Sequence, residues 1–347
     1  MANISDRRGT PAARSHRETG LRASLALATA IVAGGWWAPA ARAQQQAQGF
    51  AVERLYQSAP GAGWIVMDDL SLHGGLGGAL SLSLGYAHRP LQVTSPDGAQ
   101  SLDVVRHQTF ARVALAVTYD RYRVYASFSS PLYVSGRSGV LGNWQFTGPM
   151  ANLEQTPDAI SDVNLGFEAR FFGDPTGPLR LGASAEVIVP SGDRADYLTD
   201  DTYRAAGRLL FAGDQGRFAY AGHVGVHVRP LDEAPVPGSP RGSELLFGVA
   251  GGTRLPILGG SLLVGPEVFG ATAFRSFFGS RTTALEGLLT AAFDGSGLAD
   301  RHLRIKLGVG AGIHPQFGAP EWRAVVAFEI LGELQAPGDA GGSASSR

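Results

Sequence analysis

The chain has 347 residues, a net charge of -1 and no cysteine. The lack of cysteine excludes a disulfide framework, a thiol nucleophile and a thiolate metal site, and the near-neutral charge gives no basis for binding nucleic acid. The 48 glycines follow no collagen-like triplet and occur inside apolar alternating runs, where barrels use glycine for close strand approach.

The first 43 residues have the pattern of a secretory signal peptide. Five arginines precede the apolar stretch LALATAIVAGGWWA, and ARA at 41–43 supplies the small-x-small pattern that signal peptidase needs. We therefore expect cleavage after Ala43 and export from the cytoplasm. An uncleaved membrane anchor is the alternative, but the apolar run is short and is interrupted by glycine and proline.

Residues 44–75 contain only one short alternating stretch, around Trp64 to Asp69. The segment is compatible with three structures: an N-terminal leader in the periplasm, an inward-folded segment or an added strand. At the other end of the chain, residues 333–347 are small and polar, which indicates a flexible tail.

Between these ends, from 76 to 332, apolar and polar side chains alternate. In DVNLGFEARFF, residues 162–172, the apolar side chains fall on odd positions, and this period of two is the signature of a strand with one apolar face. Most runs are ten to fourteen residues long, enough for a tilted strand to cross a membrane, which takes about 9–11 residues. About twelve runs follow one another, at 76–88, 104–119, 121–130, 161–171, 178–189, 202–213, 217–229, 243–254, 259–274, 282–294, 301–313 and 321–331.

The connections between the runs alternate in length. A two-residue turn at Asp120–Arg121 precedes a long loop over 131–160, and the short GDPTGP and DQG turns are likewise separated by longer loops, although the contrast fades after residue 274. Outer-membrane barrels have tight periplasmic turns at one rim and long extracellular loops at the other. We therefore predict an all-β fold: an antiparallel up-and-down transmembrane β-barrel of about twelve strands over 76–332.

Charged residues of the predicted strands fall on the face opposite the apolar one, which in a barrel is the lumen. A lysine or arginine facing lipid near the midplane would cost about 2–4 kcal/mol. Basic groups outnumber acidic ones here, so the lumen is either a positively biased pore or a space filled by ion pairs that brace the wall. The candidate lumen-lining residues are Arg123, Glu168, Arg170, Arg180, Glu186, Arg204, Arg208, His223, His227, Glu267, Glu286, Arg304, Lys306, Arg323 and Glu329, and Arg112 shares their pattern.

Patterns that suggest other chemistry have simpler explanations. GVGAG at 308–312 keeps strand alternation and lacks the GK[ST] ending of a phosphate-binding loop, so it is a glycine stripe on one strand face. His223 and His227 lie four positions apart on a strand, about 13 Å, which is too far to share one metal ion. The other histidines are scattered and none falls in a G-x-S-x-G nucleophile motif, so no catalytic residue, metal site or cofactor is expected.

Several segments resemble the N-terminal barrel of a group of OmpA-like outer-membrane proteins. They are FAVERLYQSAPGAGW at 50–64, VIVPSGDRADYLTDD at 187–201, LLFAGDQGRFAYAGHVGVHVRPLD at 209–232, GSELLFGVAGGTR at 242–254, LVGPEVFG at 263–270 and FFGSRTTALEGLL at 277–289. DVNLGFEARFF followed by VPSGD also resembles, more loosely, the barrels of phenol-degradation-type and FadL-like transporters. The resemblance implies an outer-membrane barrel. The peptidoglycan-binding domain that follows the barrel in OmpA-like relatives has no counterpart before Arg347, so we expect no anchoring role.

These observations predict a narrow passive channel or transporter for small solutes in the outer membrane of a Gram-negative cell. The alternative is a structural OmpA-like envelope protein with a closed lumen, and a third, weaker one is an outer-membrane hydrolase. The expected partners are outer-membrane lipid, the barrel-assembly machinery during insertion and small solutes, with no nucleic acid.

Overall fold

The computed structural model describes residues 45–72, 74–95, 97–231, 242–296, 302–314 and 318–333. The predicted signal peptide lies outside the described residues, and so does almost all of the predicted tail. In the part of the chain that is described, no helix is long and apolar enough to cross a membrane.

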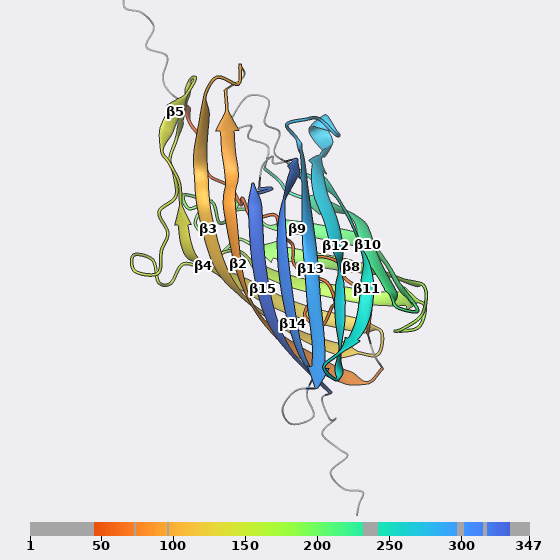
Figure 1. Ribbon diagram of the computed structural model, residues 1–347. Helices are drawn as coiled ribbons and strands as arrows, with labels where there is room; N and C mark the ends of the chain where they lie inside the picture. Colours follow the sequence, from red (N-terminus) through yellow and green to blue (C-terminus); the bar gives the residue numbers. More distant parts are fainter. Residues whose placement is uncertain are drawn as a thin grey trace, which may run out of the picture. The chain divides into compact units, whose positions relative to one another are not determined.

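Twelve antiparallel strands in the described chain form a closed barrel, which confirms the predicted fold class (Figure 1). Each strand pairs with its neighbour in sequence, and the last strand closes the barrel by pairing with the first. The strands are β2 (Leu76–Thr94), β3 (Ser101–Tyr119), β4 (Tyr122–Ser135), β7 (Val163–Phe172), β8 (Arg180–Val189), β9 (Arg204–Gln215), β10 (Phe218–Val228), β11 (Glu244–Ile257), β12 (Gly260–Ala273), β13 (Thr283–Ser296), β14 (His302–His314) and β15 (Trp322–Glu333).

The two faces of the wall differ as the alternation predicts. On β3, Leu115 and Val117 are 58% and 50% exposed, whereas their neighbours Ala114 and Ala116 are buried. Large apolar side chains are exposed in the same way on the outward face of the other strands. An outward face of this composition suits contact with hydrocarbon, and the inward face encloses the core.

The connections place two different rims at the ends of the barrel. Residues 120–121, 173–179, 216–217 and 258–259 connect strands at one end, which we call the short-turn rim. Residues 136–162 and 190–203 connect strands at the other end, the long-loop rim. At this rim, the connection after β12 contains the short helix η1 (Phe274–Ser276).

The long-loop rim has more structure than the sequence predicts. Strands β2 and β3 continue beyond the predicted runs because a register shift after His88, where Arg89 has a φ of 50°, interrupts the alternation without ending the pairing. The loop over 131–160 contains β5 (Gly139–Leu141) and β6 (Trp144–Phe146), which form a small sheet with β1 (Gln45–Gln46). Strands of two or three residues are too short to show a period in the sequence.

Candidate functional site

The N-terminal part of the described chain lies inside the barrel. We call residues 47–72 the lumen segment. Its Trp64 and Met67 are fully buried and belong to a core cluster with inward side chains of the wall, including Phe269 of β12 and Leu288 of β13. The described part of 44–75 therefore contacts the inside of the wall.

The N-terminal half of the lumen segment, residues 47–58, is held at the long-loop rim. The backbone N–H of Ala47 donates to the carbonyl of Gln145 in β6 at 2.8 Å, and that of Val52 donates to the carbonyl of Tyr197 at 3.1 Å. Phe50 packs edge-on against the Tyr197 ring, with centroids 5.9 Å apart. These side chains belong to a second apolar core, which we call the cap: Ala47, Phe50, Val52, Leu91, Val104, Val105, Val134, Leu141, Phe146, Ala151, Tyr197, Leu198 and Leu231.

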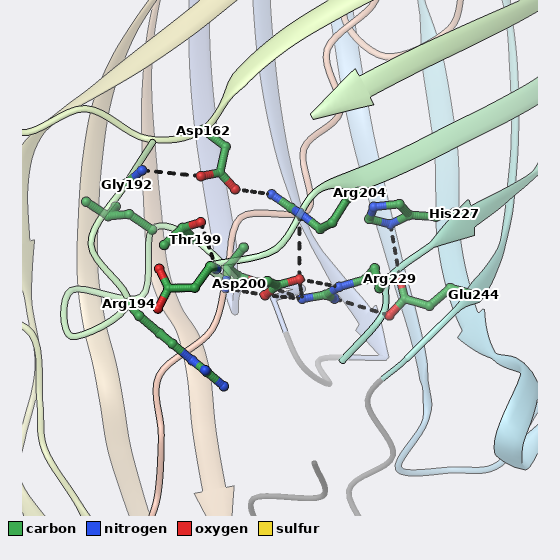
Figure 2. Close-up of polar contacts among 12 residues, drawn as sticks. Asp162, Gly192, Arg194, Thr199, Asp200, Arg204, His227, Arg229 and Glu244 are labelled. Carbon is green, nitrogen blue, oxygen red and sulfur yellow. Dashed lines mark hydrogen bonds and ion pairs between the residues drawn. The ribbon is translucent and has the colours of Figure 1, made fainter. Parts of the chain in front are cut away.

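A cluster of buried charges lies next to the cap (Figure 2). The Arg229 guanidinium donates to both carboxylate oxygens of Asp200, at 2.8 and 2.7 Å, and approaches Glu244 at 3.4 Å. Arg204 pairs with Asp162 and lies 3.6 Å from Asp200. The cluster joins the loops after β4, β8 and β10 to strands β9 and β11.

This cluster also binds the lumen segment through the backbone of Ala51. The Ala51 N–H donates to Asp200 Oδ1 at 2.9 Å, and Arg229 Nη2 donates to the Ala51 carbonyl at 3.5 Å. Burial alone would raise the pKa of Asp200, but the charge and hydrogen bonds of Arg229, together with the charge of Arg204, outweigh burial and lower the pKa to about 2. Asp200 is therefore ionised at neutral pH and links the 190–203 connection to the backbone of the segment.

The C-terminal half of the lumen segment, residues 59–72, is held by a different kind of contact. The Glu267 carboxylate on β12 accepts the backbone N–H groups of Ile65, Val66 and Met67, at 2.9, 2.9 and 3.0 Å. The Thr290 hydroxyl donates to the same carboxylate at 2.6 Å. Glu267 is fully buried, so these four donors supply its stabilisation.

Basic side chains of the wall bind carbonyl groups of the same half. They come from β14 and from the ends of β7 and β8 near the short-turn rim. The bonds are Arg304 Nη1 to Gly61 at 2.7 Å, Lys306 Nζ to Trp64 at 3.1 Å, Arg180 Nε to Asp69 at 2.9 Å and Arg170 Nη1 to Leu70 at 3.3 Å.

Inward glycines make room for the side chains of this half. A Cβ at Gly308 would lie 2.4 Å from Ile65 Cδ1, and one at Gly248 would lie 2.4 Å from Met67 Cε. At Gly252 and Gly182 a Cβ would first meet a carbonyl of the neighbouring strand, at 2.3 and 2.5 Å, and then Trp64 at 2.9 Å and Leu70 at 2.6 Å. Several glycines that the sequence suggests serve strand approach therefore form sockets for the lumen segment.

The predicted lumen-lining residues are all inward on the described strands, and only Arg304 is more than marginally exposed, at 12% of its side chain. Most form ion pairs within the wall or with the segment. The pairs are Arg123–Glu168 at 3.0 Å, Arg180–Asp214 at 2.8 Å, Arg208–Glu186 at 3.3 Å, Arg323–Glu286 at 2.7 Å and Lys306–Glu329 at 2.8 Å. That these residues line a path for small solutes stays a prediction.

The two histidines do not act together. His227 lies 3.3 Å from the Tyr56 hydroxyl and 3.7 Å from Glu244. His223 Nδ1 is buried without a hydrogen-bond partner in the described chain. The structure therefore gives each imidazole its own surroundings.

Sequence reasoning missed the acidic partners that lie outside the strands. Asp162, Asp200 and Asp214 bind inward arginines, but each stands at a strand end or in a loop, where strand alternation carries no information. It also missed Arg229, which directly follows β10. The inward glycines were the one feature of the sequence that could have indicated a chain segment inside the lumen.

Two cavities border the N-terminal half of the lumen segment. One, of about 30 Å³, is mostly apolar and lies between Tyr56 and Val66 of the segment and strands β9 to β13, where Phe269 lines it. The other, of about 60 Å³, is polar and is lined by Gln57, Arg112 and residues of β4, β7 and β8. The segment thus fills the lumen without filling all of its volume.

No protein-family model and no curated protein matches the chain. Among solved structures, an outer membrane channel from Pseudomonas putida F1 is similar at 14% identity, with a TM-score of 0.49, covering 80% of this chain and 100% of that one. The CymD monoaromatic hydrocarbon channel (8% identity, TM-score 0.41, 82% and 99% covered) and a FadL homologue of Pseudomonas aeruginosa (8%, 0.40, 83% and 99%) are also similar. The OmpA-like resemblance stays a prediction.

Proposed function

We propose that the protein is an outer-membrane channel for small solutes and that the lumen segment closes it. The observation that carries this proposal is the way the segment is held: besides apolar packing, the wall binds its backbone through hydrogen bonds from charged side chains. The apolar outward face and the unequal rims support placement in an outer membrane.

Polar contacts of this kind suit a removable closure. A hydrogen bond contributes only about 0.5–1.5 kcal/mol net, because water can replace either partner. Two small cavities border residues 51–57, so the packing beside that half of the segment is incomplete. Solute passage then requires local displacement of the segment and leaves the barrel wall intact.

A structural protein with a closed lumen is the second candidate, and the ion pairs favour it. Arg123 and Glu168 have side chains that are 2% and 0% exposed, and a pair of this kind braces two strands without conducting. Removing one partner of a buried pair costs about 3–5 kcal/mol, so these pairs oppose separation of the strands that they join.

An engineered disulfide that can be formed and reduced distinguishes the two candidate functions. Gln46 of β1 pairs in register with Gln145 of β6, and the chain has no native cysteine, so Gln46→Cys with Gln145→Cys creates a single disulfide across adjacent strands. In proteoliposomes, we expect small-solute flux through the reduced variant, lower flux after oxidation and recovery after reduction. The single variants are the controls. No flux through the wild type or the reduced variant would leave the structural candidate.

Membrane insertion is checked on the same samples. A closed barrel in detergent is expected to show a β-rich far-UV spectrum and a gel mobility that changes on boiling, because it has no free strand edge. A mature protein that is a folded monomer without detergent would contradict the membrane placement.

A further inference from the structure

The lumen segment enters the barrel at the rim opposite to the one where the wall begins. Before it, Gln45 and Gln46 pair in parallel with Trp144 and Gln145 in the connection between β4 and β7, at the long-loop rim. After it, the Asp120 N–H at the two-residue turn donates to the Gly75 carbonyl at 3.1 Å, and β2 starts at Leu76, at the short-turn rim. The chain therefore passes through the whole barrel before the first wall strand.

The contacts between these ends follow the same direction. Residues 47–52 meet the long-loop rim, residues 65–67 meet Glu267 inside the wall, and Asp69 and Leu70 meet Arg180 and Arg170, which border the 173–179 turn. A local loop returns the chain once, because the Ser58 N–H donates to the Ile65 carbonyl at 2.8 Å. It does not change the end points.

The cap makes this path part of the fold. Three of its buried side chains, Ala47, Phe50 and Val52, come from the lumen segment, and the others come from β2, β3, β4 and the long loops. The cap core is incomplete until the segment has reached the long-loop rim. Threading must therefore precede or accompany closure of the cap.

We propose that the barrel carries its own N-terminal segment across the outer membrane, so that Gln45 and Gln46 lie at the cell surface while Gly74 lies on the periplasmic side. Both glutamines are solvent-exposed, and so is Gly74, which fits residues that lie at opposite mouths. The proposal goes beyond solute transport and rests on the outer-membrane orientation with long loops outside. It gives the barrel a second activity, the export of its own chain.

Cysteine labelling on intact cells tests the path directly. The single variants are Gln46→Cys and Gly74→Cys at the two ends of the segment, with Gly142→Cys in the β5–β6 turn and Thr176→Cys in the 173–179 turn as rim markers. Using an impermeant maleimide, we expect labelling at 46 and 142 and protection at 74 and 176. All four should react after the outer membrane is disrupted, and Gln45→Cys gives a second position at the outer end.

The outcomes separate the path from the orientation. Labelling at 142 with protection at both 45 and 46 would overturn the proposed path and leave the proposed channel standing. Labelling at 74 and 176, with protection at 46 and 142, would invert the barrel and overturn the surface position. Mixed labelling of 46 with 176 would also overturn the path.

Cap disruption tests the order of assembly. Phe50→Asp places a charge in the cap core and should reduce labelling at position 46 at least several-fold while position 142 remains labelled. Leu153→Asp is the matched control, because Leu153 is exposed in the β4–β7 connection and lies outside the cap. Unchanged labelling at 46 in Phe50→Asp would show that surface delivery does not depend on the cap.

Discussion

The two halves of the lumen segment are held in different ways. In residues 47–58, the segment supplies side chains to the cap, and loops from the long-loop rim surround them. In residues 59–72, the wall supplies the side chains, and Glu267, Lys306 and Arg304 bind backbone groups of the segment. The first half is bound mainly through the side chains that it supplies to the cap, whereas the second combines wall contacts to its main chain with buried side chains such as Trp64 and Met67.

This difference has a consequence for how each half can be changed. Backbone groups are present whatever the residue, so the second half depends on the wall side chains that bind it and on the sockets that accept its own. The first half depends on its apolar residues and on the charges that surround Ala51. Substitutions in the wall should therefore act on one half, and substitutions in the loops on the other.

The largest expected effect comes from removing Glu267. Glu267→Ala leaves three backbone N–H groups of residues 65–67 without their acceptor inside the barrel, where unsatisfied buried groups cost about 1–3 kcal/mol each. We expect a loss of about 3 kcal/mol or more in barrel stability, measured as a lower temperature for the change in gel mobility, and a higher solute flux in proteoliposomes.

Glu154→Ala is the control for this change, since Glu154 is an exposed acid in the β4–β7 connection. A Glu267→Ala protein with wild-type stability and wild-type flux would mean that the wall does not hold the second half through this carboxylate.

A smaller effect is expected from Asp200, which acts on the first half. Its pKa falls from the ordinary 3.8 to about 2, a shift equivalent to about 2–3 kcal/mol. Because the folded-state pKa is lowered, this stabilisation is complete above about pH 4 and is lost as the pH falls through about 2. Asp200→Asn should lower the free energy of unfolding by about this amount at pH 7. Its difference from wild type should shrink as the pH falls from 4 to 2.

The measurement is the same gel-mobility transition, followed at pH 7 and at pH 3. If Asp200→Asn and wild type kept the same difference at both values, the ionised Asp200 carboxylate would not be the group that ties Ala51 to the cap.

Strand alternation was enough to predict the barrel wall, because an apolar outward face and an inward face against a filled lumen separate the two sides of every strand. It placed Arg123, Glu267 and Lys306 on the inward face for that reason. The partners of these residues were not predictable, since Glu267 binds a main chain that has no sequence signature. The cap was equally hidden, because its loops and two- to three-residue strands carry no period.

The inward glycines are a sequence signal that has two explanations, close strand approach and contact with a segment inside the barrel. Gly308 belongs to the stripe GVGAG, and strand pairing alone explains glycine at such a position. Its inward direction, opposite Ile65, indicates a body inside the barrel. The meaning of the stripe depends on what fills the lumen, which no single strand can tell.

The smallest expected effect tests this socket directly. Gly308→Leu places a large side chain where Ile65 lies, because even a Cβ would stand 2.4 Å from Ile65 Cδ1. Overpacking of this kind costs about 1–3 kcal/mol, at the low end when the obstacle is the end of a flexible side chain. Ile65→Ala in the same protein should restore much of the lost stability, since it empties the socket that the new leucine occupies.

Gly207→Leu is the control, because Gly207 is exposed on the outward face and a Cβ there meets no atom within 4 Å. The gel-mobility transition should thus fall for Gly308→Leu, recover in the double variant and stay near wild type for Gly207→Leu. A double variant less stable than both single ones would mean that Ile65 and Gly308 do not share one socket.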